Sequence, residues 1–75
     1  MTAAEHFAWS KERALEYVNK GDAGGAMSSF IQDLANHEGT SGILDIDLQG
    51  LFLGEVMIDG VVGARRFING LAGPQ

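Results

Sequence analysis

The chain has 75 residues and a mass of 8.0 kDa, so residues 1–75 have the size of one small domain. It carries 10 acidic and 5 basic residues, for a formal net charge of −5, and it contains no cysteine. These values exclude a disulfide framework, thiolate metal sites and a cysteine nucleophile. The hydrophobic content of 45% argues against intrinsic disorder.

The N-terminal residues 1–9 form a lead-in to the first long helix. Within this lead-in, Thr2 and Glu5 have the spacing of a capping box, which is typical of the start of a short helix. Ser10 is the predicted N-cap of a helix over residues 11–20, because apolar residues follow it at helical spacing.

A second helix is predicted over residues 23–36, with Asp22 as its N-cap and Gly21 ending the helix before it. Its apolar positions share one face of a 3.6-residue period: Ala26, Met27, Phe30, Ile31 and Leu34. The two-residue link between the helices predicts an antiparallel helical hairpin.

The middle of the chain fits two structures. Leu44, Ile46 and Leu48 alternate with polar residues, which favours a strand and an α+β fold with a hairpin at about residues 43–58. As a helix over residues 42–54, the same stretch has one apolar stripe formed by Leu44, Leu48, Leu51 and Phe52 and a second formed by Ile43, Ile46 and Leu53. A helix that is apolar on two faces is typical of the buried centre of a small bundle.

A last helix is predicted over residues 61–71, with Asp59 as its cap and Gly73 and Pro74 after its end. The most apolar run of the chain, residues 48–54, is far shorter than the roughly 20 residues of a membrane-spanning helix. The N-terminus has no basic region followed by an apolar core. We therefore expect a cytoplasmic protein with no membrane contact.

Several positions together resemble a family of small uncharacterised proteins from actinobacteria and their bacteriophages. They are Arg13-Ala14-Leu15, Gly21-Asp22, Ala26, Ser28-Ser29, Asp33-Leu34, His37 and the closing Arg65-Arg66-Phe67-Ile68-Asn69-Gly70. The resemblance covers residues 13–71, with Glu38 where the family has proline. It implies an all-helical fold and an actinobacterial or phage source, with the host cytoplasm as the location for a phage protein. It brings no known catalytic residues.

The predicted fold is therefore a compact all-α bundle of three to four short helices. A core this small, with no disulfide or metal to support it, favours association into a homo-oligomer.

Charge is distributed unevenly along the chain. No lysine or arginine occurs between Gly21 and Ala64. That stretch contains seven acidic residues: Asp22, Asp33, Glu38, Asp45, Asp47, Glu55 and Asp59. Such a surface repels phosphate, so we expect no direct nucleic-acid binding. It suits a basic protein partner, or it only keeps a small domain in solution.

Metal, cofactor and catalytic sites are not predicted. Asp45, Asp47, Gln49 and Gly50 match the first positions of a calcium loop, but the position of its final bidentate glutamate is occupied by Val56. His6 and His37 are the only imidazoles, and each has only an adjacent glutamate as a second ligand. Ser28-Ser29 lie within a predicted helix, without the strand–turn–helix elbow of a nucleophile.

The predicted partner-binding residues combine an aromatic residue with charged ones: Trp9, Asp33, Asp45, Asp47, Arg65 and Arg66. Trp and Arg are enriched at binding hot spots. All of them except Asp33 also have a structural interpretation, and Asp45 and Asp47 fit solvated acids on the surface or in the first turn of a helix. Trp9 fits a hydrophobic staple against Ala14, and Arg65-Arg66 fit an ion pair with Glu55 or Asp59.

The functional hypothesis is a non-enzymatic module that docks on a larger protein, in the host cell if the chain is of phage origin, and modulates it. A self-associating structural or assembly component of a phage particle is the alternative from another class. A third hypothesis is an acidic mimic of DNA that blocks a nucleic-acid-binding protein, with binding that falls steeply with salt.

Overall fold

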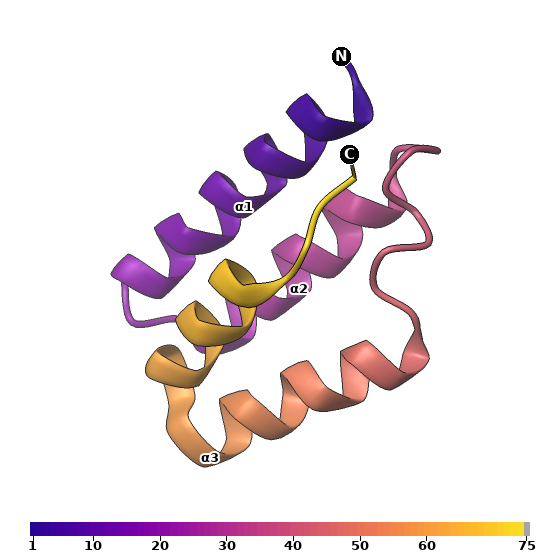
Figure 1. The fold of residues 1–75 in the computed structure, drawn as a ribbon. Helices are drawn as coiled ribbons and strands as arrows, with labels where there is room; N and C mark the ends of the chain where they lie inside the picture. Colours follow the sequence, from indigo (N-terminus) through magenta and orange to yellow (C-terminus); the bar gives the residue numbers. More distant parts are fainter. Residues whose placement is uncertain (75) are drawn as a thin grey trace.

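The computed structural model describes residues 1–74 and consists of three helices joined by a short turn and a longer loop (Figure 1). The helices are α1 (Ala3–Asn19), α2 (Ala23–Ala35) and α3 (Ile46–Gly70). No strand occurs within residues 1–74. The predicted all-α bundle is confirmed, and the alternative with a hairpin at about residues 43–58 is wrong because this stretch is helical from Ile46 onward.

Helix α1 begins at the capping box rather than at Ser10. The Thr2 hydroxyl accepts a hydrogen bond from the backbone N–H of Glu5 (3.1 Å), and the Glu5 carboxylate accepts one from the backbone N–H of Thr2 (2.9 Å). The predicted cap at Ser10 is wrong. Ser10 is buried in mid-helix, where its hydroxyl donates to the carbonyl of His6 at 2.8 Å.

The turn between α1 and α2 forms as predicted. Gly21 adopts a φ of 81°, a left-handed conformation that favours glycine. The carboxylate of Asp22 then accepts a hydrogen bond from the N–H of Gly25 at 2.8 Å and caps α2. Figure 1 shows α1 and α2 side by side in opposite directions, which confirms the predicted helical hairpin.

Helix α3 starts at an N-cap that was not predicted, where the Asp45 carboxylate accepts from the N–H of Leu48 at 2.9 Å. The helix is interrupted at Gly60 (φ 56°, ψ −131°), where the chain reverses direction (Figure 1). We call residues 46–59 its first arm and residues 61–70 its second arm. Gly63 lets the arms approach closely, because a Cβ at this position would overlap the carbonyl of Glu55. Asp59, the predicted cap of the second arm, instead binds Arg66.

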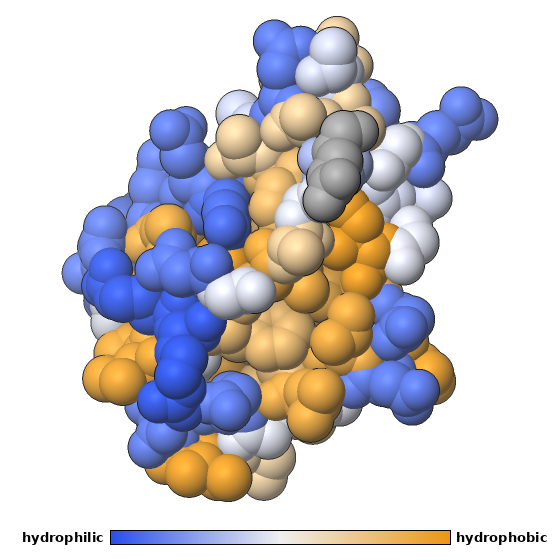
Figure 2. All heavy atoms as spheres, in the orientation of Figure 1, coloured by the Kyte–Doolittle hydropathy of each residue, from blue (hydrophilic) through white to orange (hydrophobic). Residues whose placement is uncertain are grey.

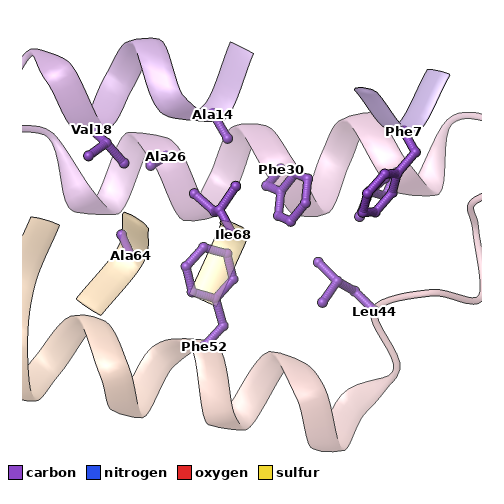
Figure 3. Close-up of a cluster of buried hydrophobic side chains, with 10 residues drawn as sticks. Phe7, Ala14, Val18, Ala26, Phe30, Leu44, Phe52, Ala64 and Ile68 are labelled. Atoms are coloured by element: carbon purple, nitrogen blue, oxygen red, sulfur yellow. The ribbon is translucent and has the colours of Figure 1, made fainter. Parts of the chain in front are cut away.

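A row of aromatic side chains connects all three helices through the core. Phe7 lies 6.1 Å from Phe30, and Phe30 meets Phe52 edge to face at 6.2 Å, measured between ring centroids. Phe52 in turn stacks on Phe67 at 4.3 Å. Phe52 points from the first arm of α3 toward Ile68 and Phe30 (Figure 3). The first arm therefore buries the face that carries Phe52.

The loop between α2 and α3 is fastened to the core. Thr40 is fully buried, and its hydroxyl donates to the carbonyl of Leu34 at 2.7 Å. Leu44 inserts into the core just before α3 (Figure 3). None of the helices in residues 1–74 combines the length and the apolar character needed to cross a membrane.

Candidate functional site

The predicted partner residues Trp9 and Asp33 lie on either side of Arg13, in a row that joins α1 to α2. The guanidinium of Arg13 lies 4.9 Å from the centroid of the Trp9 ring, and its Nε donates to the Asp33 carboxylate at 2.8 Å. Asp33 is buried and also accepts a bond from the Ser29 hydroxyl at 3.3 Å. Its carboxylate is therefore engaged within the chain, whereas Trp9 remains 39% exposed.

The two histidines lie beside this row and fasten the start of α1 to the end of α2. Their rings stack with centroids 4.7 Å apart. The backbone carbonyl of Asp33 is an acceptor only, so the His6 Nε2 at 2.5 Å must be the donor. His37 accepts at Nδ1 from the N–H of Gly39 (3.0 Å) and lies with Nε2 3.3 Å from the carbonyl of Met1. These contacts give both imidazoles a structural role.

The predicted arginine pair is engaged by acceptors of the chain itself. Arg66 donates to Asp59 at 2.6 Å and also binds Glu55, so it links the two arms of α3 across Gly60. The hydrogen bond to Asp59, followed by the one to Glu55, raises the pKa of Arg66. Arg65 donates to the side-chain oxygen of Asn19 at 2.9 Å and joins α3 to α1.

The remaining predicted residues, Asp45 and Asp47, lie in the first turn of α3. Asp45 is the N-cap, and Asp47 is exposed without a hydrogen bond or ion pair to its carboxylate among residues 1–74. They belong to a helix rather than to a calcium loop, and no group of three or more His, Cys, Asp or Glu within residues 1–74 is arranged to hold a metal ion. The six predicted residues thus form three separate groups and not one site.

Five of the seven acidic residues between Gly21 and Ala64 have partners within the chain. Asp22 and Asp45 are helix caps, Asp33 pairs with Arg13, and Glu55 and Asp59 pair with Arg66. Only Glu38 and Asp47 have carboxylates without a partner among residues 1–74. The acidic stretch therefore presents fewer free charges to another molecule than its composition indicates.

The most unusual surface is the outer face of the first arm of α3, on the side opposite Phe52. It consists of Ile46, Leu51, Leu53, Met57 and Ile58, together with Gly50 and Gly54, and we call it the α3 face. Its five large side chains are between 45% (Leu53) and 84% (Ile46) exposed. Figure 2 shows hydrophobic side chains at the surface along the lower edge of the molecule, where the first arm runs in Figure 1.

The α3 face was missed as a site, although the pattern that produces it is visible in the sequence. The two apolar stripes of this helix indicated a bundle centre with both sides covered. The structure covers Leu48 and Phe52 of the first stripe and leaves Ile46 and Leu53 of the second open to solvent. The prediction was wrong for Leu51 of the first stripe, which is 62% exposed, and Ile43 of the second stripe packs against the core before α3 begins. Single exposed apolar side chains are ordinary, but a contiguous apolar patch of several hundred Å² marks an interaction surface.

The face is suited to binding and not to chemistry. None of its seven residues carries a nucleophile, acid or base, and Asp47 beside them is the only charged residue on this side of the first arm. No pocket is hollowed into the surface formed by residues 1–74. Comparison with protein-family models, with curated proteins and with solved structures found no match to this chain.

Proposed function

We propose that the protein is a small non-enzymatic protein-binding module that docks on another protein chain through the α3 face and modulates it. The observation that carries the proposal is this uncovered apolar helix face, with Ile46, Met57 and Ile58 each more than three-quarters exposed. An amphipathic helix commonly binds a partner by laying such a face against an apolar surface.

The charge pattern determines which partner suits this face. Asp47 lies beside the α3 face and Asp45 at its end, so a partner with an apolar strip and a neighbouring basic residue is complementary. Most acids of the 21–64 stretch have internal partners, so we assign the greater part of the affinity to apolar contact. Binding should therefore weaken only moderately with salt.

Self-association into a structural or assembly component, as in a phage particle, is the second candidate. The observation that favours it is the flat, uncharged centre of the α3 face at Gly50 and Gly54, where a Cβ would meet no atom within 4 Å. The DNA-mimic hypothesis gains less support. A mimic needs a row of free carboxylates, whereas Arg13 and Arg66 engage three of them.

The test is affinity capture with immobilised wild-type protein and with an Ile46→Gln, Ile58→Gln variant. Both positions are exposed, so the variant keeps the core intact. The prey is an actinobacterial lysate, the source that the sequence resemblance implies, and separately the purified chain itself. We expect a protein that the wild type retains in low and in 0.5 M salt (about a 4 Å screening length) and that the variant loses. Equal retention by both baits would refute the proposed function.

A further inference from the structure

The α3 face has a centre, and it lies directly opposite the buried Phe52. A helix turns by about 100° per residue, so the two residues at equal distance before and after Phe52 lie at mirror positions on either side of this centre. Gly50 and Gly54 are the pair closest to it. The backbone is therefore most accessible in the middle of the face, and large side chains surround it.

Apart from one pair, the residues of the face are the same at equal distances before and after Phe52. Leu51 matches Leu53, Gly50 matches Gly54, and Ile46 matches Ile58. Asp47 and Met57 are the one unmatched pair on the exposed side. A twofold axis through the centre of the face would place each residue against its match in an antiparallel second helix, so leucine would meet leucine, glycine would meet glycine and isoleucine would meet isoleucine. A twofold interface uses the same patch on both chains and requires this kind of self-complementarity.

We infer that a second copy of the chain covers the α3 face, with the two first arms packed antiparallel across Gly50 and Gly54. The inference rests on the proposed function, because it names the chain that docks there. Small residues at the crossing point allow two helix backbones to approach closely. The five large side chains then pack around that point.

The area of the face is sufficient for such a dimer. From the exposed fractions, the five large side chains and two glycines leave roughly 600 Å² accessible on each copy, so pairing would bury at most about 1,200 Å², the lower limit of the standard size for a specific interface. Buried area does not fix affinity, but interfaces at the lower end of the size range are mostly those of weak or transient complexes. We therefore expect dissociation in the micromolar range, which ordinary biophysical measurements cover.

The charges select the antiparallel orientation. In a parallel pair, the two Asp47 carboxylates would lie side by side in an apolar contact, which is unfavourable. In the antiparallel pair, each Asp47 lies five residues from the axis, so the two are about 15 Å apart along the helix. This distance exceeds the screening length of about 8 Å at physiological salt. Each Asp47 then lies opposite Met57 of the other copy.

Sedimentation equilibrium measures the mass as a function of concentration and tests the pairing. We expect the wild type to change from 8.0 kDa to twice that mass as its concentration rises through the micromolar range. Leu53→Gln with Met57→Gln should raise the dissociation constant by about 100-fold or more while leaving the far-UV CD spectrum unchanged, because glutamine is as good a helix former as leucine and methionine. Ala8→Gln with Ala35→Gln, at exposed positions of α1 and α2, is the control and should dimerise like the wild type.

The absence of cysteine allows the orientation to be tested by disulfide trapping. A mixture of Asp47→Cys and Met57→Cys chains should form the mixed disulfide, because these positions face each other across the antiparallel pair. Asp47→Cys alone should remain unlinked. Efficient linkage of Asp47→Cys to itself would overturn the antiparallel arrangement.

The outcomes separate this inference from the proposed function. A wild type that stays at 8.0 kDa up to millimolar concentration would overturn the second copy as occupant. If the capture experiment still showed a protein bound through the α3 face, the proposed function would stand with a different partner. A monomer that retained no protein but co-sedimented with phosphatidylcholine vesicles would overturn both and assign the face to lipid.

Discussion

Phe52 is the side chain on which the packing of α3 against the hairpin depends most directly. It is fully buried, stacks on Phe67 at 4.3 Å and meets Phe30 edge to face at 6.2 Å. Replacing a buried phenylalanine with alanine costs about 3–5 kcal/mol, through lost transfer free energy and the cavity that remains. The two aromatic contacts, worth about 0.5–1.5 kcal/mol each beyond their buried area, place Phe52→Ala toward the upper end of that range.

The consequence depends on the total stability. A domain of this length has a free energy of unfolding of about 4–11 kcal/mol. With a urea m-value of about 1 kcal/mol/M, Phe52→Ala should lower the unfolding midpoint by about 3–5 M. A domain at the lower end of the stability range would then be close to half unfolded in buffer. Phe52→Leu retains most of the volume and should lower the midpoint by about 1–2 M.

Urea titration followed by far-UV CD, at one fixed protein concentration, measures both variants. Gln32→Ala, at an exposed position of α2, is the control and should change the free energy of unfolding by less than about 0.5 kcal/mol. A loss of under about 1 kcal/mol for Phe52→Ala would mean that the first arm does not pack its Phe52 face into the core. The exposure of the α3 face, which follows from that packing, would then be refuted as well.

Three further predictions concern local features of the fold. Gly60→Ala should lower the free energy of unfolding by about 1–3 kcal/mol, because φ at this position is 56°. Gly24→Ala should instead stabilise α2 by about 0.5–1 kcal/mol, because its Cβ would meet nothing closer than 3.8 Å. Thermal denaturation ranks the two variants. Asp33→Asn should cost about 1–2 kcal/mol in urea titration, because it removes one charge from the pair with Arg13 and retains an acceptor oxygen; no loss would mean that the pair is dispensable. Hydrogen bonds from the backbone and then the side chain of Thr2 lower the pKa of Glu5 below its ordinary 4.5. The stability that the wild type gains over Glu5→Gln should therefore be present at pH 7 and disappear as the pH falls through that lowered pKa. A gain that persists in acid would contradict the capping box.

Local rules predicted the helices well wherever a side chain and its partner lie within one turn. Spacing alone indicates interactions that lie within three or four residues, which here are the capping box at Thr2, the N-cap at Asp22 and the glycine turn at Gly21. Ser10 satisfied the same local rule and was misleading. A serine is equally satisfied by bonding to the carbonyl four residues earlier inside a helix, as Ser10 does with His6, and only the burial of that helix distinguishes the two roles.

The predicted partner residues were harder to assign because their partners are distant in sequence. Asp33 meets Arg13 20 residues away, and the sequence did not indicate this pair. The ion pair of Arg66 with Glu55 and Asp59 was one of the predicted alternatives, and it is confirmed across the reversal at Gly60. A charged residue appears free in a sequence until the fold brings its counter-charge into contact. Net charge therefore does not indicate which charged residues are available to bind a partner.

Residues 46–58 show that burial predicted from a sequence can exceed the burial that one chain provides. Their two apolar stripes indicate a helix covered on both sides, yet α1, α2 and the second arm of α3 together cover only the side of Phe52. Gly60 and the loop before Asp45 determine which side that is, and neither is encoded in the periodicity. If this apolar pattern reports which residues are buried when the protein functions, the stripe of Ile46 and Leu53 must be covered by another molecule. The α3 face is nearly symmetric about Phe52, so a second copy of the chain is the simplest molecule to cover it. The sedimentation experiment decides whether the prediction of a covered helix was wrong or only incomplete.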